Sequence, residues 1–135
     1  MYEVKTGVIP ATEELTALYA SVGWTAYTKD PERLYRAATA SLGLYTVWED
    51  GMLIALLRCV GDGETILYVQ DLLVRPEHQR RGLGRMLLTR VQGDFPTVRQ
   101  KVLMTDNVPE TAAFYRACGL RPAGEYGCAA WCKYD

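Results

Sequence analysis

A nine-residue and almost wholly apolar stretch, residues 66–74, constrains the fold of this chain more than any other segment. Apolar and β-branched side chains favour a strand, and a near-continuous run predicts a strand that is covered on both faces. Pro76 ends this strand because proline lacks the N–H that a sheet hydrogen bond requires. A glycine-containing turn, Gln79-Arg80-Arg81-Gly82-Leu83-Gly84, follows. Beyond the turn, apolar residues recur at helical spacing and predict an amphipathic helix over residues 83–95.

The rest of the chain divides into short strands and helices separated by glycine or proline. Strands are predicted at residues 2–6, 44–49, 52–60, within 98–106 and at 129–134, and helices at 12–22, 31–41 and 109–118. Asp50 and Gly51 join two of these strands into a hairpin, since glycine accepts the positive dihedral angle of a tight turn. Residues 23–27 are predicted to break the first helix. This order predicts one mixed α/β domain spanning residues 1–135.

Composition and charge narrow the classes of function. The chain has 135 residues, of which 49% are hydrophobic and 23% charged, enough for one hydrophobic core. Its formal net charge is −1, so no overall basic field attracts nucleic acid or an anionic membrane. No apolar run is long enough to cross a bilayer, and the first residues lack the pattern of a signal peptide. We therefore expect a cytoplasmic protein with no membrane and no nucleic-acid partner.

The four cysteines and the single histidine do not predict a metal site. Cys59, Cys118, Cys128 and Cys132 include no Cys-x-x-Cys pair, and His78 lies far from the last two in sequence. A structural zinc site usually needs about four ligands at recognisable spacing. We expect the cysteines to be small, buried, reduced side chains and the protein to bind no metal.

The glycine turn has the chemistry of an anion site. A helix N-terminus presents unpaired N–H groups and a partial positive charge, and both favour a phosphate. Gly82 and Gly84 have no Cβ, so an anion can approach the backbone closely, while Arg80 and Arg81 add positive charge. The turn lacks the Gly-Lys-Ser/Thr of a P-loop and the Gly-x-Gly-x-x-Gly of a dinucleotide site. Taken alone, it fits either a phosphate cradle or an ordinary strand-to-helix turn.

Two segments together resemble the GNAT superfamily of N-acetyltransferases. The glycine turn, preceded by the apolar strand, is similar to that family's acetyl-CoA signature, Gln/Arg-x-x-Gly-x-Gly/Ala. The second segment, Phe114-Tyr115-Arg116-Ala117-Cys118-Gly119-Leu120, is similar to its Phe/Leu-Tyr-x-x-x-Gly-Phe motif, with Leu120 in place of the usual Phe. The resemblance covers residues 44–120 and implies a mixed, mostly antiparallel central sheet flanked by helices.

The resemblance also implies where acetyl-CoA binds. Backbone groups of Leu72, Leu73 and Val74 would contact the pantetheine arm, and a backbone N–H of the same strand would polarise the acetyl carbonyl. Amides of the glycine turn would hold the pyrophosphate. The remaining implied cofactor residues are Gln79, Arg80, Arg81, Gly82, Leu83, Gly84, Arg85, Asn107 and Phe114. Asn107 stands eight residues before Tyr115, one more than the commonest spacing in the family.

Two residues are candidates for proton transfer. Tyr115 matches the family's general-acid tyrosine, and its phenol, with a reference pKa of about 10, stays protonated at neutral pH. Its alternative role is to pack its ring against the sheet. Asp71 is a carboxylate in an otherwise apolar strand, where an unpaired charge is costly. It is either a general base or amine binder, or a structural carboxylate that caps loop amides or pairs with an arginine.

The acceptor amine is the least defined part of this prediction. In the family, the first two helices and their loop commonly wall the acceptor site. The lining residues that follow are Trp24, Tyr27 and Tyr35, with Tyr126 as a further candidate near the C-terminus. Aromatic rings at such positions either hold an amine by cation–π contact or belong to the core. His78 is expected to be a solvated loop residue rather than a catalyst.

The sequence therefore predicts transfer of the acetyl group of acetyl-CoA to a primary amine of a small molecule or peptide, through a tetrahedral intermediate. An acetyl-CoA-binding sensor or interaction module of the same fold, without turnover, is the alternative. Nucleic-acid binding through the arginines of the turn is disfavoured by a net charge near zero. A homodimer is a further expectation, because a closing strand such as residues 129–134 often helps form dimers in this family.

Overall fold

The computed structural model describes residues 1–135, which form two compact units, residues 1–104 and 105–135. The first unit contains one five-stranded sheet in the order β1-β2-β3-β4-β5. Its strands are β1 (Glu3–Thr6), β2 (Gly43–Glu49), β3 (Met52–Gly61), β4 (Ile66–Val74) and β5 (Gln100–Leu103). Neighbours are antiparallel from β1 to β4, and β5 runs parallel to β4. The predicted mixed, mostly antiparallel sheet is therefore confirmed.

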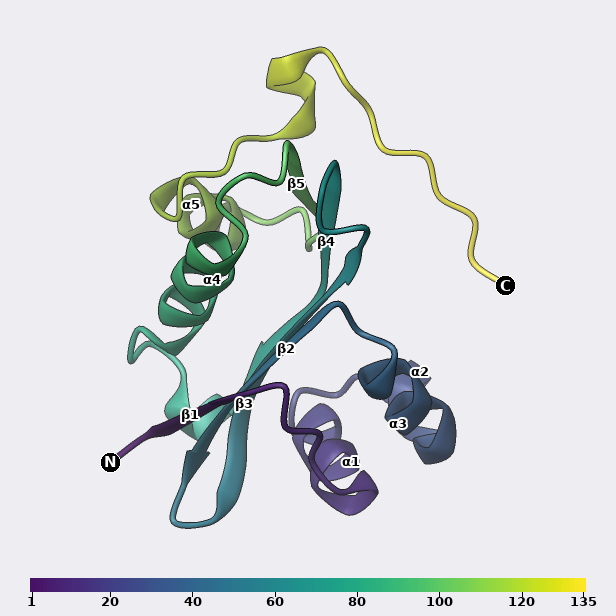
Figure 1. Cartoon of the computed structure of the whole chain (residues 1–135), viewed down its shortest axis with the longest axis vertical. Helices are drawn as coiled ribbons and strands as arrows, with labels where there is room; N and C mark the ends of the chain where they lie inside the picture. Colours follow the sequence, from purple (N-terminus) through teal and green to yellow (C-terminus); the bar gives the residue numbers. More distant parts are fainter. The chain divides into compact units, whose positions relative to one another are not determined.

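Helices cover both faces of this sheet (Figure 1). Helices α1 (Thr12–Ser21), α2 (Thr25–Thr28) and α3 (Pro31–Thr39) lie on one side, and α4 (Leu83–Asp94) lies on the other. Side chains of α1 and α3 join those of the sheet in one buried cluster that includes Leu15, Leu34, Leu56 and Leu73. Burying each such leucine stabilises the fold by roughly 1.5–3 kcal/mol. The predicted helices α1 and α3 thus pack on the sheet through apolar side chains.

Helix α2 is an addition to the predicted elements, because the sequence indicates only a break at residues 23–27. It is a single turn that begins after Trp24 and contains no buried residue. A helix this short shows no periodic apolar pattern, so periodicity does not reveal it. The turn brings Trp24 and Tyr27 next to Tyr19 of α1.

Strands β2 and β3 form the predicted hairpin. Asp50 and Gly51 between them both adopt left-handed φ, 51° and 80°. Two successive left-handed residues form the tight turn whose twist matches that of the flanking strands. The connection holds β2 and β3 antiparallel over their length.

The second unit contains α5 (Pro109–Ala117) and a short 3-10 helix, η2 (Ala123–Tyr126). The predicted closing strand at residues 129–134 is wrong, since these residues have no regular structure and pair with no strand. Trp131 and Tyr134 are 93% and 85% exposed. Their residue types favour a strand, but a strand also needs a neighbour for its backbone groups.

Candidate active site

Strand β4 changes its environment halfway along its length. Up to Val69 it pairs with β3 on one side and with β5 on the other, and the pair of Val69 with Leu103 is the last with β5. Residues 70–74 keep only β3 as a neighbour. Their other edge therefore presents backbone N–H and C=O groups without a strand partner, and an extended ligand can bind to such an edge.

A β-bulge marks the same point of β4. The pairing with β3 shifts by one residue beyond Arg58 and Asp71, so that Gln70 has no partner on β3. A bulge changes the direction of side chains from strict alternation and is common beside active sites. Strict alternation would place Gln70 on the face opposite Asp71, yet both side chains reach the hydroxyl of Tyr27.

The glycine turn leads from β4 to the N-terminus of α4. A short 3-10 helix, η1 (Pro76–His78), comes first, and Arg80 and Gly82 then adopt left-handed φ of 63° and 79°. Gly82 is the N-cap of α4, and no side chain caps the helix. A Cβ at Gly82 would meet no atom within 4 Å, so the space beside it is open. The first N–H groups of α4 have no intrahelical partner and are suited to bind an anion.

Side chains of the turn hold it in place. Gln79 Nε2 donates to Val74 O at 3.0 Å, which ties the turn to the end of β4. Arg81 Nη1 donates to the hydroxyl of Tyr2 at 2.9 Å, and that hydroxyl lies 3.1 Å from His78 Nδ1. His78 is not a fully solvated loop residue as expected, because it is half-buried and packs edge-on against Tyr2. Gln79 and Arg81, two of the predicted cofactor residues, thus also stabilise the turn itself.

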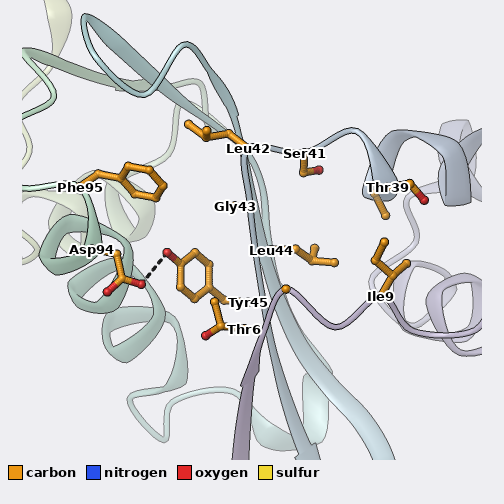
Figure 2. A pocket seen from close by; sticks show the side chains of 12 residues that line it. Thr6, Ile9, Thr39, Ser41, Leu42, Gly43, Leu44, Tyr45, Asp94 and Phe95 are labelled. Atoms are coloured by element: carbon orange, nitrogen blue, oxygen red, sulfur yellow. Dashed lines mark hydrogen bonds between the residues drawn. The ribbon is translucent and has the colours of Figure 1, made fainter.

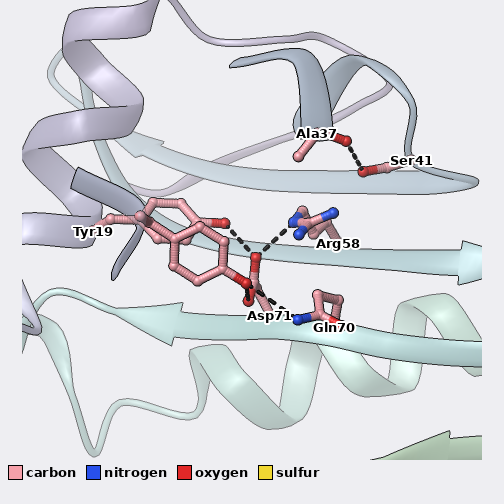
Figure 3. Close-up of polar contacts among 7 residues, drawn as sticks. Tyr19, Ala37, Ser41, Arg58, Gln70 and Asp71 are labelled. Carbon is pink, nitrogen blue, oxygen red and sulfur yellow. Dashed lines mark hydrogen bonds and ion pairs between the residues drawn. The ribbon is translucent and has the colours of Figure 1, made fainter. Parts of the chain in front are cut away.

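A buried polar cluster surrounds Asp71, whose side chain is 2% exposed (Figure 3). Asp71 Oδ2 accepts from Arg58 Nε at 2.6 Å and from the Tyr19 hydroxyl at 2.8 Å. Asp71 Oδ1 accepts from the Tyr27 hydroxyl at 2.7 Å, and Gln70 Nε2 donates to that same hydroxyl at 3.2 Å. We call these five residues the Asp71 cluster. The pairing of Asp71 with an arginine, one of the alternatives drawn from the sequence, is present in the structure.

Burial sets the protonation states around Asp71. It raises the pKa of the Tyr19 phenol, and the neighbouring Asp71 charge raises it further. Burial and the hydrogen bond to Asp71 likewise raise the pKa of Tyr27. Burial by itself would lower the pKa of the Arg58 guanidinium, but the Asp71 carboxylate outweighs this and the net shift is upward. At neutral pH Asp71 is therefore surrounded by three proton donors, an arrangement that is stable only while every partner is present.

Three aromatic rings pack beside the Asp71 cluster. The ring centroid of Tyr19 lies 4.9 Å from that of Tyr27 and 5.8 Å from that of Trp24, both edge-on. Trp24 and Tyr27 pack against the core cluster and stay partly exposed. The structure thus gathers Trp24, Tyr27 and Asp71 in one neighbourhood. Of the other predicted lining residues, Tyr35 is exposed on α3 and Tyr126 is exposed in the second unit.

Three members of the Asp71 cluster are not among the residues predicted from the sequence: Tyr19, Arg58 and Gln70. Arg58 does leave a signal, because it is the one charged residue in the apolar segment 52–60 and faces a strand with one carboxylate. Two lone, opposite charges in neighbouring apolar strands indicate a cross-strand ion pair. Tyr19 leaves none, since a tyrosine in the apolar stripe of a helix has the pattern of an ordinary core residue.

The second unit carries the remaining predicted residues. Phe114 and Tyr115 are neighbours on α5, with their rings edge-on and 5.0 Å between centroids. Burial raises the pKa of the Tyr115 phenol above its ordinary value. The phenol is therefore protonated at neutral pH, as a general acid must be. Asn107 is exposed in the loop before α5.

A cavity of about 290 Å³ lies at the opposite end of α4 from the glycine turn (Figure 2). Asp94 and Phe95 at the C-terminal end of α4 line it, together with Gly43 and Leu44 at the start of β2. Tyr45 also lines it, and its hydroxyl donates to Asp94 Oδ2 at 2.8 Å. None of the predicted site residues belongs to this cavity.

The cysteines differ in exposure. Cys59 is buried, as expected, whereas Cys128 and Cys132 are exposed, contrary to the expectation. Those two follow η2 in a segment that has no regular structure. No three side chains of His, Cys, Asp or Glu lie close enough together to hold a metal ion. None of the helices has the length and apolar character needed to span a membrane.

The mostly antiparallel sheet with helices on both faces is the fold that the resemblance in sequence implies. Residues 9–120 match the family model described as "Acetyltransferase (GNAT) family". That match spans most of the chain, and the chain belongs to the GNAT acetyltransferase family.

Individual relatives agree with this assignment. The Prochlorococcus marinus protein named "uncharacterized N-acetyltransferase ycf52-like" is 32% identical over 126 residues, which cover 87% of this chain and 67% of that protein. The GNAT-family acetyltransferase SP0256 of Streptococcus pneumoniae is 32% identical, with a TM-score of 0.89 over 100% of this chain and 98% of that one. AAC(6')-Iy, solved with the bisubstrate analogue CoA-S-monomethyl-acetylneamine, shares the fold, with a TM-score of 0.75 over 100% of this chain and 97% of that one, at 14% identity.

Proposed function

We propose that this protein transfers the acetyl group of acetyl-CoA to a primary amine. The observation that carries the proposal is the form of β4, which loses β5 after Val69 and leads through η1 into the glycine turn. One strand edge and one helix N-terminus thus offer backbone groups to an extended molecule that carries phosphates. The family membership, and the coenzyme A analogue bound by AAC(6')-Iy, support acetyl-CoA as that molecule.

Acetyl-CoA fits the groups available along this path. The pyrophosphate would bind the amides of residues 80–85, where the space beside Gly82 is open and α4 begins without a side-chain cap. Leu72, Leu73 and Val74 would contact the pantetheine arm through their backbone groups. Asn107 and Phe114 complete the proposed cofactor residues.

The reaction exchanges a C–S bond for a C–N bond, and proton transfers accompany this exchange at the nitrogen and at the sulfur. The amine nitrogen, as free base, attacks the thioester carbonyl, and a backbone N–H of β4 stabilises the negative oxygen of the tetrahedral intermediate. The C–S bond then breaks with its electron pair on sulfur, and Tyr115 gives a proton to the departing thiolate. The acceptor ammonium loses one proton to a base or to water before the attack. After the attack the positively charged nitrogen loses a second proton, which passes through water to the Tyr115 phenolate and restores the phenol.

Asp71 is the predicted base or amine binder, and its contacts define what that role would require. Its two oxygens already accept hydrogen bonds from Arg58, Tyr19 and Tyr27. Because the Asp71 side chain is 2% exposed, direct proton transfer from the amine to Asp71 would require the Tyr27 side chain to move aside. Water as the base requires no such movement.

A screen of primary amines tests the proposed function. Titration calorimetry measures acetyl-CoA binding, and thiol release together with the mass of the product measures transfer. We expect binding, and coenzyme A release that depends on the amine. Binding without release from any amine would favour the sensor alternative, and absence of binding would contradict both.

Tyr115→Phe tests the proposed general acid. Removal of the phenolic proton is expected to lower kcat about 100-fold or more, while the Kd of acetyl-CoA stays near the wild-type value. Tyr134→Phe, which changes an exposed tyrosine of the same unit, is the matched control. If Tyr115→Phe retained full kcat, Tyr115 would have no part in proton transfer.

The acceptor and the assembly complete the proposal. We propose a small-molecule or peptide amine as acceptor, no nucleic-acid partner, a cytoplasmic location and a homodimer. Trp131 and Tyr134 are exposed apolar residues that a second copy of the chain would cover. Light scattering is expected to give twice the chain mass for the wild type and a lower mass for Trp131→Ser, whereas a monomeric wild type would contradict the dimer.

A further inference from the structure

The hydrogen bonds around Tyr27 have a fixed direction. The Asp71 carboxylate beside Arg58 accepts hydrogen bonds, so the proton of the Tyr27 hydroxyl points to Asp71 Oδ1. The same hydroxyl can then only accept from Gln70, which presents Nε2 to it. The carbonyl oxygen of the Gln70 amide must therefore point away from Tyr27.

Gln70 stands at the start of the unpaired half of β4. Gln70 is the bulged residue of β4, without a partner on β3, and it comes directly after the last residue that pairs with β5. Its side chain is exposed. It precedes Leu72 by two residues, about 7 Å along a strand, and Leu72 is the first of the residues proposed to contact the pantetheine arm.

We propose that Gln70 binds the acceptor amine, its amide oxygen accepting a hydrogen bond from an N–H of that amine. Arg58, Asp71 and Tyr27 are positioning residues, because they fix which end of the Gln70 amide faces the acceptor. The inference rests on the proposed acetyl transfer and adds the residue that recognises the nucleophile.

A neutral amide oxygen suits a nucleophile that changes its charge before it reacts. The primary ammonium must lose a proton to attack, and the free amine still has two N–H groups beside its lone pair. One of them can donate to Gln70 Oε1 both before and after that loss. A carboxylate in the same place would favour the charged form and oppose its deprotonation.

Kinetics of Gln70→Leu test the contact, with spermidine and n-butylamine as acceptor probes. The change removes one hydrogen bond to the amine, so KM for the amine is expected to rise about 5- to 10-fold. The Kd of acetyl-CoA is expected to stay within about twofold. Gln100→Leu, at an exposed glutamine in β5, is the matched control and should leave both values unchanged. An amine KM for Gln70→Leu equal to that of Gln100→Leu would overturn the proposal.

Tyr27→Phe tests the positioning part. The variant keeps the ring but removes the hydroxyl that holds Gln70 Nε2, so the amide can rotate. We expect KM for the amine to rise about threefold with kcat nearly unchanged, a split that general destabilisation would not produce. A fall in kcat at constant KM would contradict a role through Gln70.

A third measurement needs no turnover and no variant that must fold. The side-chain Nε2–H resonances of Gln70 in 15N-labelled wild-type protein are followed during titration with spermidine. We expect them to shift on binding, while those of Gln100 stay fixed. Unchanged Gln70 resonances would overturn the proposal, even if transfer is observed. A shift without transfer to any amine would leave Gln70 as a binding residue and contradict the proposed function alone.

Discussion

The glycine turn and the Asp71 cluster are built in opposite ways, although both belong to or follow β4. The turn depends on the backbone: left-handed dihedrals at Arg80 and Gly82 and a helix N-terminus without a side-chain cap. The Asp71 cluster depends on side chains from α1, α2, β3 and β4, of which Tyr19, Arg58 and Asp71 are buried. The three donors to Asp71 lie 52, 44 and 13 residues away in the sequence.

Under the proposed function, this difference would separate the binding of acetyl-CoA from the binding of the acceptor. A backbone site recognises a phosphate group that is the same in every reaction of the family, and it tolerates changes of most side chains. A network of side chains can differ from one protein to the next and can shape a site for one acceptor. We therefore expect changes in the Asp71 cluster to affect stability and amine recognition, and changes in the glycine turn to affect cofactor binding.

Asp71→Ala should give the largest effect. It leaves the Arg58 guanidinium buried without its partner, so the free energy of unfolding is expected to fall by about 3–5 kcal/mol. Urea denaturation at neutral pH measures this loss. Replacing both charges, with Arg58→Met and Asp71→Leu, should recover most of it. A loss below about 1 kcal/mol for Asp71→Ala would show that the cluster does not hold the fold together.

Gly82→Trp tests the backbone-built region. The side chain would fill the open space beside the turn, and loss of two or more charge-assisted hydrogen bonds is expected to weaken acetyl-CoA binding by roughly 100-fold or more. Calorimetry measures the change. Gly93→Trp, in equally open space near the other end of α4, is the control and should bind normally. Gly82→Ala separates backbone strain at φ 79° from blockage of the space. Normal binding by Gly82→Trp would make the turn merely structural.

A smaller effect is expected at alkaline pH, where Tyr19 of the Asp71 cluster should contribute less to the free energy of unfolding. Because the folded-state pKa of Tyr19 is raised by burial, its contribution to stability is complete below its unfolded pKa of about 10 and decreases as the pH rises above it. Between pH 10 and 11 the wild type should lose about 1 kcal/mol relative to Tyr19→Phe. Denaturation of both proteins from pH 8 to 11 measures the difference. A constant difference across that range would contradict a buried, protonated Tyr19.

The sequence predicts the glycine turn well because that region is local. A strand, a proline, two glycines and a helix follow one another along the sequence, and each has its own backbone preference. The hairpin at Asp50 and Gly51 is predictable for the same reason. The single turn α2 is missed because it is too short for a period to appear.

The Asp71 cluster was only partly predictable because it is formed by long-range packing. A lone aspartate in an apolar strand indicates that a partner exists, but spacing along the chain does not identify Tyr19 or Tyr27. The bulge that brings Gln70 to Tyr27 depends on the register of β3 against β4, which no local pattern specifies. At residues 129–134 the local pattern predicts a strand that the fold does not form. Their propensity is that of a strand, but no partner strand pairs with them.

Amide hydrogen exchange with and without acetyl-CoA tests most directly the claim that the unpaired half of β4 and the glycine turn form the cofactor site. We expect slower exchange at residues 72–74 and 82–85 when acetyl-CoA is present, and unchanged exchange at residues 67–69, which already have β3 and β5 as neighbours. Unchanged exchange at both predicted segments, or slowing confined to the cavity residues 41–45 and 94–95, would contradict it.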